Sequence, residues 1–484
     1  MKDLALSALD LVARRGVSYA DIRAIETRDR EISTKNGKAG HVSSSESMGV
    51  GIRVLAHGCW GFAATDDLTA HGLEAAATLA LEIARSGTAA HKHDVDLAAE
   101  DRHEATWVSE FRTDPFTISI DQQLALLLAV DTELRRQKGI SMAEASMHFE
   151  RRRQVFASTL GSHIDQTRYT AGAGFSALSY QDDEIQRRSY PNSFGGQYQL
   201  KGYELVEELK LLENAPRIAE EAVALHAADQ CPEGEFDLIL DSSQLGLQIH
   251  ESIGHPIELD RVLGTEANYA GMSFLTLDQL GHLRYGSELV NVVCDARVEH
   301  GPGLGTFAYD DEGVAAQSTD IIRNGQFVGY MTSRETAAQV GQPRSNGCMR
   351  ADGWARLPLI RMTNVSLEPG KQSIEEVFDS PRAIYMETNR SWSIDDKRYN
   401  FQFGCEIGWE MRDGKRVRML KNPSYSGIST EFWNSCAAIA GREHWTLWGV
   451  PNCGKGQPEQ VMGTGHGASP ARFRKVKIGS AYAG

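Results

Sequence analysis

A strand, a helix start and two histidines follow one another in the stretch FDLILDSSQLGLQIHESIGH, residues 236–255. Its beginning, residues 236–240, is dominated by apolar side chains and is typical of a buried strand. Ser242 and Ser243 are candidate N-caps, because a hydroxyl can accept a hydrogen bond from the unpaired backbone N–H groups of a first helical turn. Residues 245–250 can then continue as a helix, so the stretch predicts a strand that leads directly into a helix.

The end of this stretch, His250-Glu251-Ser252-Ile253-Gly254-His255, has the pattern HExxxH. Two imidazoles can hold a zinc ion, and the carboxylate of Glu251 can take a proton from water, which is the minimum equipment for metal-assisted hydrolysis of an amide. The spacing is one residue longer than in HExxH. In a regular α-helix, residues five apart are splayed by roughly 140°, so His250 and His255 would not face one ion.

The residues around His255 offer a way to bring the two rings together. Gly254 weakens the helix, and Pro256 disfavours the α conformation at His255. We therefore expect His255 where the helix ends or widens, and a π-bulge, which occurs often at functional sites, would also bring the rings together. The alternative is an ordinary helix end with two unrelated histidines.

Residues 229–235 are the best candidate domain boundary, because expected helices and strands alternate before them and mostly strands and glycine-rich turns follow. The expected class is α+β, with a mixed helix and antiparallel-sheet domain at 1–230 and a largely β domain at 231–484 that carries the metal site. The expected helices cover 3–15, 68–85, 121–138 and 203–228, with a break considered at Pro216, and short helical stretches at 335–340 and 374–378. The expected strands cover 20–25, 31–34, 49–55, 60–64, 142–151, 153–159, 164–178, 290–296, 327–331, 360–367, 383–387 and 407–412.

Composition limits the class of protein. The chain has 484 residues, of which 41% are hydrophobic and 24% charged, and its formal net charge is −15. This is a globular composition, and the negative charge argues against nucleic acid as a partner, because phosphate binding requires a basic surface. We expect no signal peptide and no membrane helix. The seven cysteines form no CxxC pair, which favours a cytoplasmic protein with mostly buried thiols. His91-Lys92-His93 is expected on the solvated surface.

Several segments form an ordered set along the chain. They are Gly51 to Phe62, His250 to His255, Tyr309-Asp310-Asp311-Glu312-Gly313, Thr319 to Gly325, Arg361-Met362-Thr363-Asn364 and Asn452-Cys453-Gly454-Lys455. Together they resemble the TldD/PmbA family of metalloproteases, named as modulators of DNA gyrase, and specifically its TldD-type catalytic subunit. Each segment is weak alone, but their order, spacing and agreement in total length make the resemblance specific.

The resemblance implies a zinc site made by the two motif histidines and a distant cysteine, which matches Cys453. Three protein ligands leave a fourth position for water, and a cysteine ligand favours zinc over iron or manganese. The resemblance also implies that Glu251 is the general base and that the substrate is an unfolded or extended peptide, read with broad sequence tolerance. The expected partner is a second copy or a TldE/PmbA-type paralogue that lacks the motif.

Two other functions stay open at this point. One is a non-catalytic regulator that binds peptides or proteins, and Glu251 discriminates against it, because a binding protein needs no general base beside a metal ligand. The other is zinc-dependent hydrolysis of a non-peptide amide. His466 and Arg361 are candidates for stabilising the oxyanion, each with a structural role as its alternative. The acidic segment 310–313 lacks the alternating ligands of a calcium loop, and we interpret it as a turn or structural support.

Overall fold

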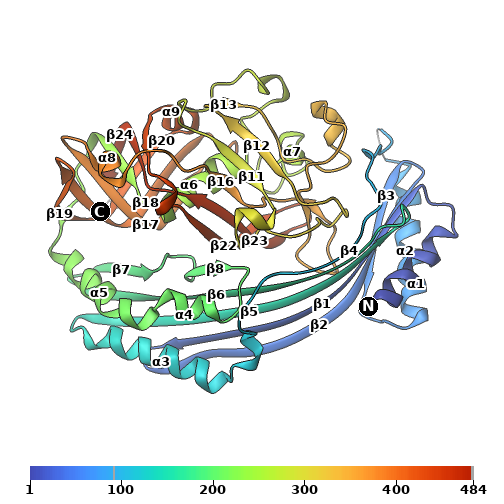
Figure 1. Cartoon of the computed structure of the whole chain (residues 1–484), viewed down its shortest axis with the longest axis horizontal. Helices are drawn as coiled ribbons and strands as arrows, with labels where there is room; N and C mark the ends of the chain where they lie inside the picture. The colour runs from blue at the N-terminus through green and yellow to red at the C-terminus, as the bar shows by residue number, and fades with distance from the viewer. Residues whose placement is uncertain (91–92, 481–484) are drawn as a thin grey trace.

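The computed structural model describes residues 1–90 and 93–480, so His91 and Lys92 lie outside the described residues. Helices and strands mix in the N-terminal half, and strands prevail in the C-terminal half (Figure 1). The α+β class expected from the sequence is therefore confirmed. The two-domain division at residue 230 stays a prediction.

Four long antiparallel strands form the centre of the N-terminal sheet and curve beneath the C-terminal region (Figure 1). In spatial order they are β2 Lys38–Ala56, β1 Tyr19–Lys35, β5 Ile140–Ser158 and β6 His163–Gln181. Shorter strands complete the sheet, namely β3 Cys59–Thr65 beside β2, and β4 Glu104–Val108, β7 Glu184–Tyr190 and β8 Gln197–Gln199 beside β6. The expected hairpin of 49–55 and 60–64 is the pairing of β2 with β3.

Two of the long strands are continuous where the sequence predicts an interruption. The expected pair 20–25 and 31–34 is the single strand β1, and 142–151 and 153–159 belong to β5. Charged residues in the middle of these strands form ion pairs across the sheet instead of ending it. Arg151 pairs with Glu26 at 3.2 Å, and Arg153 pairs with Asp165 at 2.7 Å.

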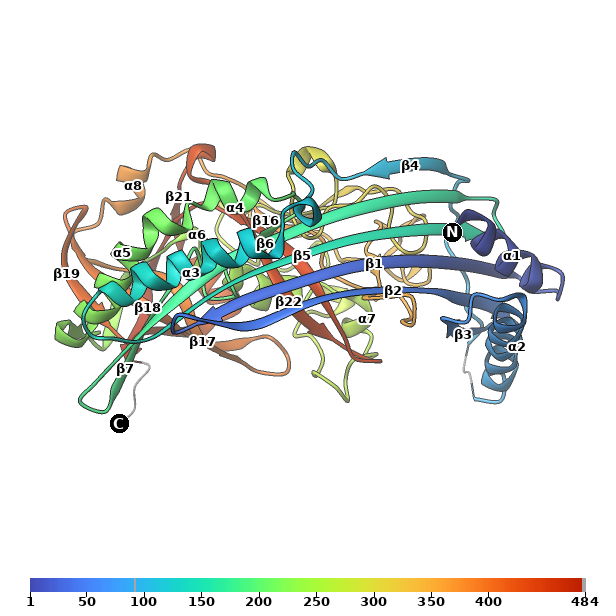
Figure 2. The ribbon, with the colours of Figure 1, turned by 90° about the horizontal axis from the view of Figure 1, so that it is seen from below.

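Alternate residues of this sheet face opposite sides, as the period of two in a strand requires. On β5, Val155 packs in the core beneath the first helices, whereas the side chain of Gln154 reaches the C-terminal region. Helices cover the lower face at its two ends (Figure 2). They are α1 Lys2–Ala13 and α2 Ala70–Gly87 at one end, and α3 Ile120–Arg136, α4 Glu204–Leu209 and α5 Leu211–Ala224 at the other.

The helix expected at 203–228 is divided at a different residue from the one considered. Lys210, with a left-handed φ of +48°, separates α4 from α5, and Pro216 lies inside α5. The turn at Lys210 lets both helices press apolar side chains on one core, which includes Leu205 of α4 and Ile218 of α5. The packing of two helices on the curved sheet outweighs the local preference of proline.

Among the described residues, the C-terminal region holds a second eight-stranded sheet, a four-stranded sheet and two strand pairs. The large sheet consists of β9 Asp229–Gln230, β10 Gly234–Leu240, β17 Ala383–Ile394, β18 Asn400–Arg412, β19 Lys415–Lys421, β20 Pro423–Ile428, β21 Cys436–Ile439 and β24 Ala471–Ser480. The four-stranded sheet consists of β11 Val292–Asp295, β12 Ser318–Arg323, β13 Gln326–Phe327 and β16 Val365–Leu367. The pairs are β14 Met349–Arg350 with β15 Leu359–Ile360, and β22 Thr446–Lys455 with β23 Gln460–Ala468. The helices are α6 Ser242–Ile249, α7 Leu259–Val262, α8 Ile374–Phe378 and α9 Ser429–Asn434.

Three expected elements of this region are shorter or divided. The strand expected at 327–331 ends with β13, and the helical stretch expected at 335–340 is only a 3₁₀ turn, Ala337–Val340. The strand expected at 360–367 divides into β15 and β16 because the residues between them leave the ladder. Arg361 donates to the carbonyl of Cys453 at 2.5 Å, and Asn364 forms a bridge with Gly465.

The acidic segment 310–313 fastens the C-terminal region to the N-terminal sheet. The carboxylate of Asp311 accepts from the side chain of Gln154 at 2.7 Å, and that of Glu312 pairs with Arg53 at 3.1 Å. Asp310 accepts from the backbone N–H of Val314 at 3.0 Å, which closes a turn. The interpretation as a turn with a supporting role is confirmed.

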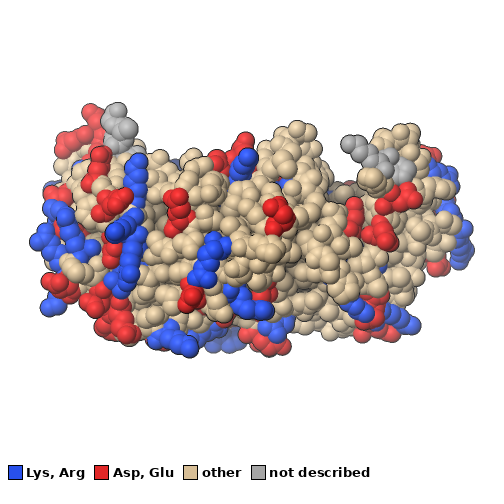
Figure 3. Space-filling view, turned by 90° about the horizontal axis from the view of Figure 1, so that it is seen from above, with Lys and Arg blue, Asp and Glu red and all other residues tan. Residues whose placement is uncertain are grey.

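The surface carries both signs of charge. On the face in Figure 3, Lys and Arg side chains alternate with Asp and Glu side chains instead of forming one continuous basic area. The absence of a nucleic-acid partner stays a prediction. Across residues 1–90 and 93–480, the structure has no helix with the length and apolar character needed to span a membrane.

Candidate metal centre

The motif begins at the end of a short helix that follows strand β10. Asp241 caps this helix, since its carboxylate accepts from the backbone N–H groups of Ser243 at 2.8 Å and Gln244 at 3.1 Å. The expected caps, Ser242 and Ser243, instead lie in the first turn of α6. An aspartate at this position can accept from two backbone N–H groups at once, which a single hydroxyl one residue later does less well.

The helix widens at the first histidine, as the spacing of the motif predicts. Residues His250–Gly254 form a π-helical turn, and the backbone N–H of His255 donates to the carbonyl of His250 at 3.2 Å, five residues back. The wider turn places both rings on one side, with ring centroids 4.9 Å apart and planes at 89°. The predicted π-bulge is confirmed, and it converts the HExxxH spacing into two imidazoles on one face.

Cys453, on strand β22, is the third side chain that reaches this point. Its Sγ lies 3.8 Å from Nε2 of His255, and donor atoms of His250, His255 and Cys453 all lie within 4.8 Å of one another. All three residues are buried. Two imidazole nitrogens and one thiolate are a donor set that suits zinc, so the residues present fit this metal.

A chain of hydrogen bonds fixes which nitrogen of His250 is available. His466 Nδ1 lies 3.0 Å from the carbonyl of Val365, and a carbonyl only accepts, so His466 Nδ1 carries a proton. Its Nε2, 2.8 Å from His250 Nδ1, then acts as acceptor. His250 therefore carries its proton on Nδ1 and keeps the lone pair of Nε2 free for a metal.

His255 is oriented in the same way by a carboxylate. Its Nδ1 lies 3.0 Å from Oε2 of Glu258, so Nδ1–H donates and Nε2 stays free on the side of Cys453. Glu258 is fully buried and also pairs with Lys455 at 3.3 Å, while Lys455 pairs with Asp260 at 2.7 Å. Partners of this kind around metal-ligating histidines fix ring orientation and raise ligand basicity.

Burial and nearby charges shift the pKa values of the three donor groups. Burial lowers the pKa of His250, and it lowers the pKa of His255 further, with the positive charge of Arg398 as the next cause. Burial opposes ionisation of the Cys453 thiol, but the charge of Arg361 and the contact with His255 outweigh it, so the pKa of Cys453 lies below its ordinary value. These shifts favour neutral imidazoles and make the Cys453 thiol easier to deprotonate, and both changes favour metal binding.

Glu251 lies beside these groups with a cationic partner. Its carboxylate, 7% exposed, pairs with the guanidinium of Arg398, which belongs to the loop between β17 and β18. No local sequence pattern indicates Arg398, which lies 147 positions further along the chain. Glu258 is also absent from the residues expected at the site, although a carboxylate three residues after a motif histidine is a detectable signal.

The two candidates for oxyanion stabilisation contact residues of the candidate metal centre: His466 contacts His250, and Arg361 contacts Cys453. His466 uses both ring nitrogens in contacts with His250 and Val365. Arg361 is fully buried, and its guanidinium donates to the carbonyl of Cys453. The contacts seen for both residues match the structural alternative, in which they hold ligand-bearing segments in place.

Comparison with known proteins places this geometry in a family. Three family models match successive parts of the chain: PmbA/TldA metallopeptidase domain 1 at residues 20–84, the central domain at 113–228 and the C-terminal domain at 233–480. The last match contains all the residues of the candidate metal centre.

Relatives that match all or half of the chain carry metalloprotease names. A metalloprotease of Methanothermobacter thermautotrophicus is 29% identical over 465 residues, which is 96% of each chain. A metalloprotease TldD homolog of Haemophilus influenzae is 23% identical over 96% of this chain and 93% of its own. A zinc metalloprotease TldD homolog of Saccharolobus solfataricus is 30% identical, over 51% of this chain and 52% of its own.

Solved structures share the fold across the whole chain. One from Thermotoga maritima, described as a modulator of a DNA gyrase, has a TM-score of 0.77 at 18% identity and covers 98% of this chain and 99% of its own. TldE from Thermococcus kodakarensis has a TM-score of 0.71 at 16% identity and covers 99% of each. With the three family models in chain order, the chain belongs to the PmbA/TldD family of metallopeptidases.

Proposed function

We propose that this protein is a zinc-dependent peptidase that hydrolyses unfolded or extended peptides. His250, His255 and Cys453 would hold the zinc, and Glu251 would act as general base. One observation carries the proposal: two imidazoles with free Nε2 atoms and a thiol converge within 4.8 Å beside a buried carboxylate. The metalloprotease names of the relatives support it.

The residues of the site divide the work of hydrolysis among them. Zinc bound there would polarise the scissile carbonyl and make a water molecule more acidic. Glu251 takes the proton from the attacking water and later hands it to the leaving amine. A thiolate ligand donates more charge than an imidazole, so a further cation is needed beside the developing oxyanion. Arg398, whose charge acts on both histidines and on Glu251, is the best placed side chain for this role.

The surroundings support an extended peptide as the substrate. Cys453 lies in the hairpin of β22 and β23, which is a two-stranded sheet of its own. An extended peptide can add to such a sheet by main-chain hydrogen bonds, which read little side-chain sequence. Broad sequence tolerance and exclusion of folded proteins follow. The fold shared with a TldE supports pairing with a second copy or with such a paralogue. A cytoplasmic location is also proposed, on the scattered cysteines without a CxxC pair.

Metal content and peptide cleavage, measured together, test this function. Wild type and Glu251→Gln should each hold about one zinc per chain by mass spectrometry, while only wild type cleaves an unfolded peptide. We expect a loss of roughly 10²–10⁴-fold, the usual contribution of a general base. Glu288→Gln, whose side chain is 85% exposed, is the matched control. Full activity in Glu251→Gln would remove the assigned base, and activity that survives chelation would remove the metal mechanism.

A further inference from the structure

A cavity, named the arginine cavity for three of its lining residues, lies between the N-terminal sheet and the hairpin that carries Cys453. Its volume is about 150 Å³, which is room for a side chain or a chain terminus. The sheet contributes Arg152 and Arg168, which face each other across β5 and β6, and β14 contributes Arg350. Met462 and Gly463 of β23 close the other side.

The guanidinium groups in this cavity are not neutralised in the usual way. Within residues 1–90 and 93–480, no carboxylate forms an ion pair with any of the three arginines. Arg152 and Arg350 are 5% and 3% exposed, and the Nε of each is buried without a hydrogen-bond partner. Arg350 donates only to backbone carbonyls, and Arg152 donates to that of Ala351. The side chain of Arg168 meets no hydrogen-bond partner in the described part of the chain.

Two carboxylates also line the cavity but leave an excess of positive charge. Asp352 already accepts from the backbone N–H of Val461 at 3.1 Å and pairs with Arg356 at 3.5 Å. Asp311, outside the lining, and Glu150 compensate the charge of Arg168 in part, but neither forms an ion pair with it. Burial, followed by the nearby Arg168, lowers the pKa of Arg350 to about 9, and the charge of Asp311 offsets only part of this lowering.

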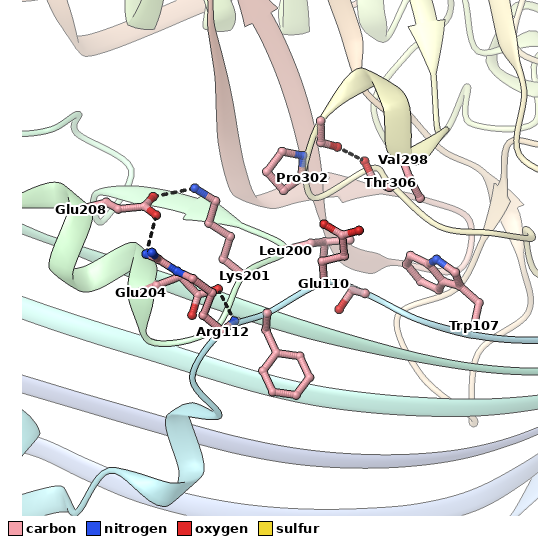
Figure 4. Close-up of a pocket in the computed structure, with 13 residues that line it drawn as sticks. Trp107, Glu110, Arg112, Leu200, Lys201, Glu204, Glu208, Val298, Pro302 and Thr306 are labelled. Atoms are coloured by element: carbon pink, nitrogen blue, oxygen red, sulfur yellow. Dashed lines mark hydrogen bonds and ion pairs between the residues drawn. The ribbon is translucent and has the colours of Figure 1, made fainter.

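A larger cavity at the same junction differs in that its charged side chains form ion pairs with one another. Its volume is about 480 Å³, and it is lined by Trp107 and by charged residues that include Arg112, Lys201 and Glu208 (Figure 4). These charges are satisfied by one another, because Glu208 accepts from Arg112 at 3.0 Å and from Lys201 at 2.6 Å (Figure 4). The two cavities share Leu200 in their linings, so they adjoin. The unpaired arginines are thus particular to the smaller one.

The arginine cavity lies next to the candidate metal centre. Met462, in its lining, is the direct partner of Cys453 across the hairpin, and paired strands lie about 4.8 Å apart. The same strand continues to His466, which contacts His250. The distance from Cys453 to the lining of this cavity is thus comparable to the length of one or two residues of an extended peptide.

We propose that the arginine cavity binds a carboxylate of the peptide substrate, either its C-terminus or an acidic side chain close to the scissile bond. This specificity rests on the proposed peptidase function. Arg168 is the residue that meets the carboxylate, because its guanidinium is the one without a structural contact. Arg152 and Arg350 shape the cavity and add to its positive potential.

Binding to the metal-free protein tests the anion site without any hydrolysis. The calorimetric probes are acetylated penta-alanine with a free carboxylate and the same peptide with a terminal amide. A second pair, both amidated, has Glu or Gln at its centre. We expect the carboxylate member of one pair to bind about tenfold or more tightly, as a charge-assisted hydrogen bond allows. Which pair shows the preference tells a chain terminus from an acidic side chain.

Variants decide whether the preference comes from this cavity. Arg168→Gln should abolish it, and Arg168→Lys should retain part of it. Arg153→Gln is the matched control, since Arg153 is the neighbour of Arg152 but pairs with Asp165 on the other face. Equal binding within both pairs in wild type, no binding of any probe up to millimolar concentration, or an unchanged preference in Arg168→Gln would each overturn the proposal.

Kinetics of the zinc-loaded protein separate this proposal from the one on which it rests. If the peptidase function holds, Arg168→Gln should raise KM for the carboxylate peptide about tenfold more than for its amide. A wild type that cleaves neither peptide refutes the peptidase function, while the calorimetric preference still decides the anion site. Cleavage with equal KM for carboxylate and amide peptides counts against the anion site alone.

Discussion

Replacing Glu258 by Gln should weaken zinc binding while leaving the fold in place. In the structure, Oε2 of Glu258 accepts a hydrogen bond from Nδ1 of His255 at 3.0 Å, and the side chain of Glu258 is fully buried. Glutamine keeps the size of the side chain but removes its charge. Lys455 loses one anionic partner and retains Asp260 at 2.7 Å, so no unpaired buried charge is created.

The magnitude follows from the role of Glu258 behind a ligand. Loss of a partner that orients a metal-ligating histidine typically costs 10–100-fold in metal affinity, about 1.4–2.8 kcal/mol. The Glu258 charge also raises the pKa of His250 and of Cys453, against the net lowering of each. Removing it reduces proton competition at these two ligands, which offsets part of the loss. We therefore expect a reduction nearer to tenfold than to a hundredfold.

Competition with a chelating indicator of known zinc affinity measures this change at fixed pH. The exposed Glu288→Gln serves as the control for loss of a negative charge, and circular dichroism of the metal-free variant verifies the fold. A zinc Kd within a factor of two of wild type in the folded Glu258→Gln protein would refute the reasoning. It would show that the ring of His255 is held by packing and not by this hydrogen bond.

Three further predictions concern the same site and the junction beneath it. Cys453→Ser should lose most bound zinc, since a hydroxyl is a far weaker ligand than a thiolate, and unchanged stoichiometry by mass spectrometry would exclude the cysteine. Burial lowers the pKa of His250, His255 and His466, so the unfolded chain binds more protons than the folded protein below about pH 6.5. The free energy of unfolding of the metal-free protein, measured with urea, should therefore fall as the pH falls below that value, by up to about 1.4 kcal/mol per pH unit for each histidine. A free energy of unfolding that does not change with pH in this range would contradict the prediction. Gly51→Val should destabilise the protein by about 1–3 kcal/mol, because its Cβ would lie 2.5 Å from the carbonyl oxygen of Trp354. An unchanged urea midpoint would show that the backbone at Trp354 moves away without a cost in stability.

Local chemistry made the motif predictable to the level of backbone geometry. The five-residue spacing of His250 and His255 is incompatible with one face of a regular helix, and Gly254 and Pro256 indicate where regularity ends. The π-helical turn satisfies both conditions, since it adds one residue per turn. The sequence places the N-cap at Ser242 or Ser243, one or two residues after Asp241, the residue between the expected strand and these serines that caps the helix.

Long strands were harder to predict, because their continuity depends on partners far away in the sequence. A run such as Arg151-Arg152-Arg153 looks like an interruption when read alone. In the sheet, Arg151 and Arg153 find carboxylates on the neighbouring strands, while Arg152 faces the C-terminal region. The order of the strands has the same origin: β10 pairs in parallel with β17, more than a hundred residues later, and no local pattern records this.

The residues that contact the candidate ligands keep the two histidine rings oriented by hydrogen bonds within the protein. Each histidine carries its proton on Nδ1 because a protein acceptor holds it there, Glu258 for His255 and His466 for His250. A metal bound there would therefore not have to select one tautomer from a mixture or order two free rings, because the cost of arranging the candidate ligands is met during folding. The same reasoning accounts for the limit of prediction from sequence. The ligands share a motif or a family resemblance, whereas His466 acts only because strand β23 brings it beside His250, 216 positions away.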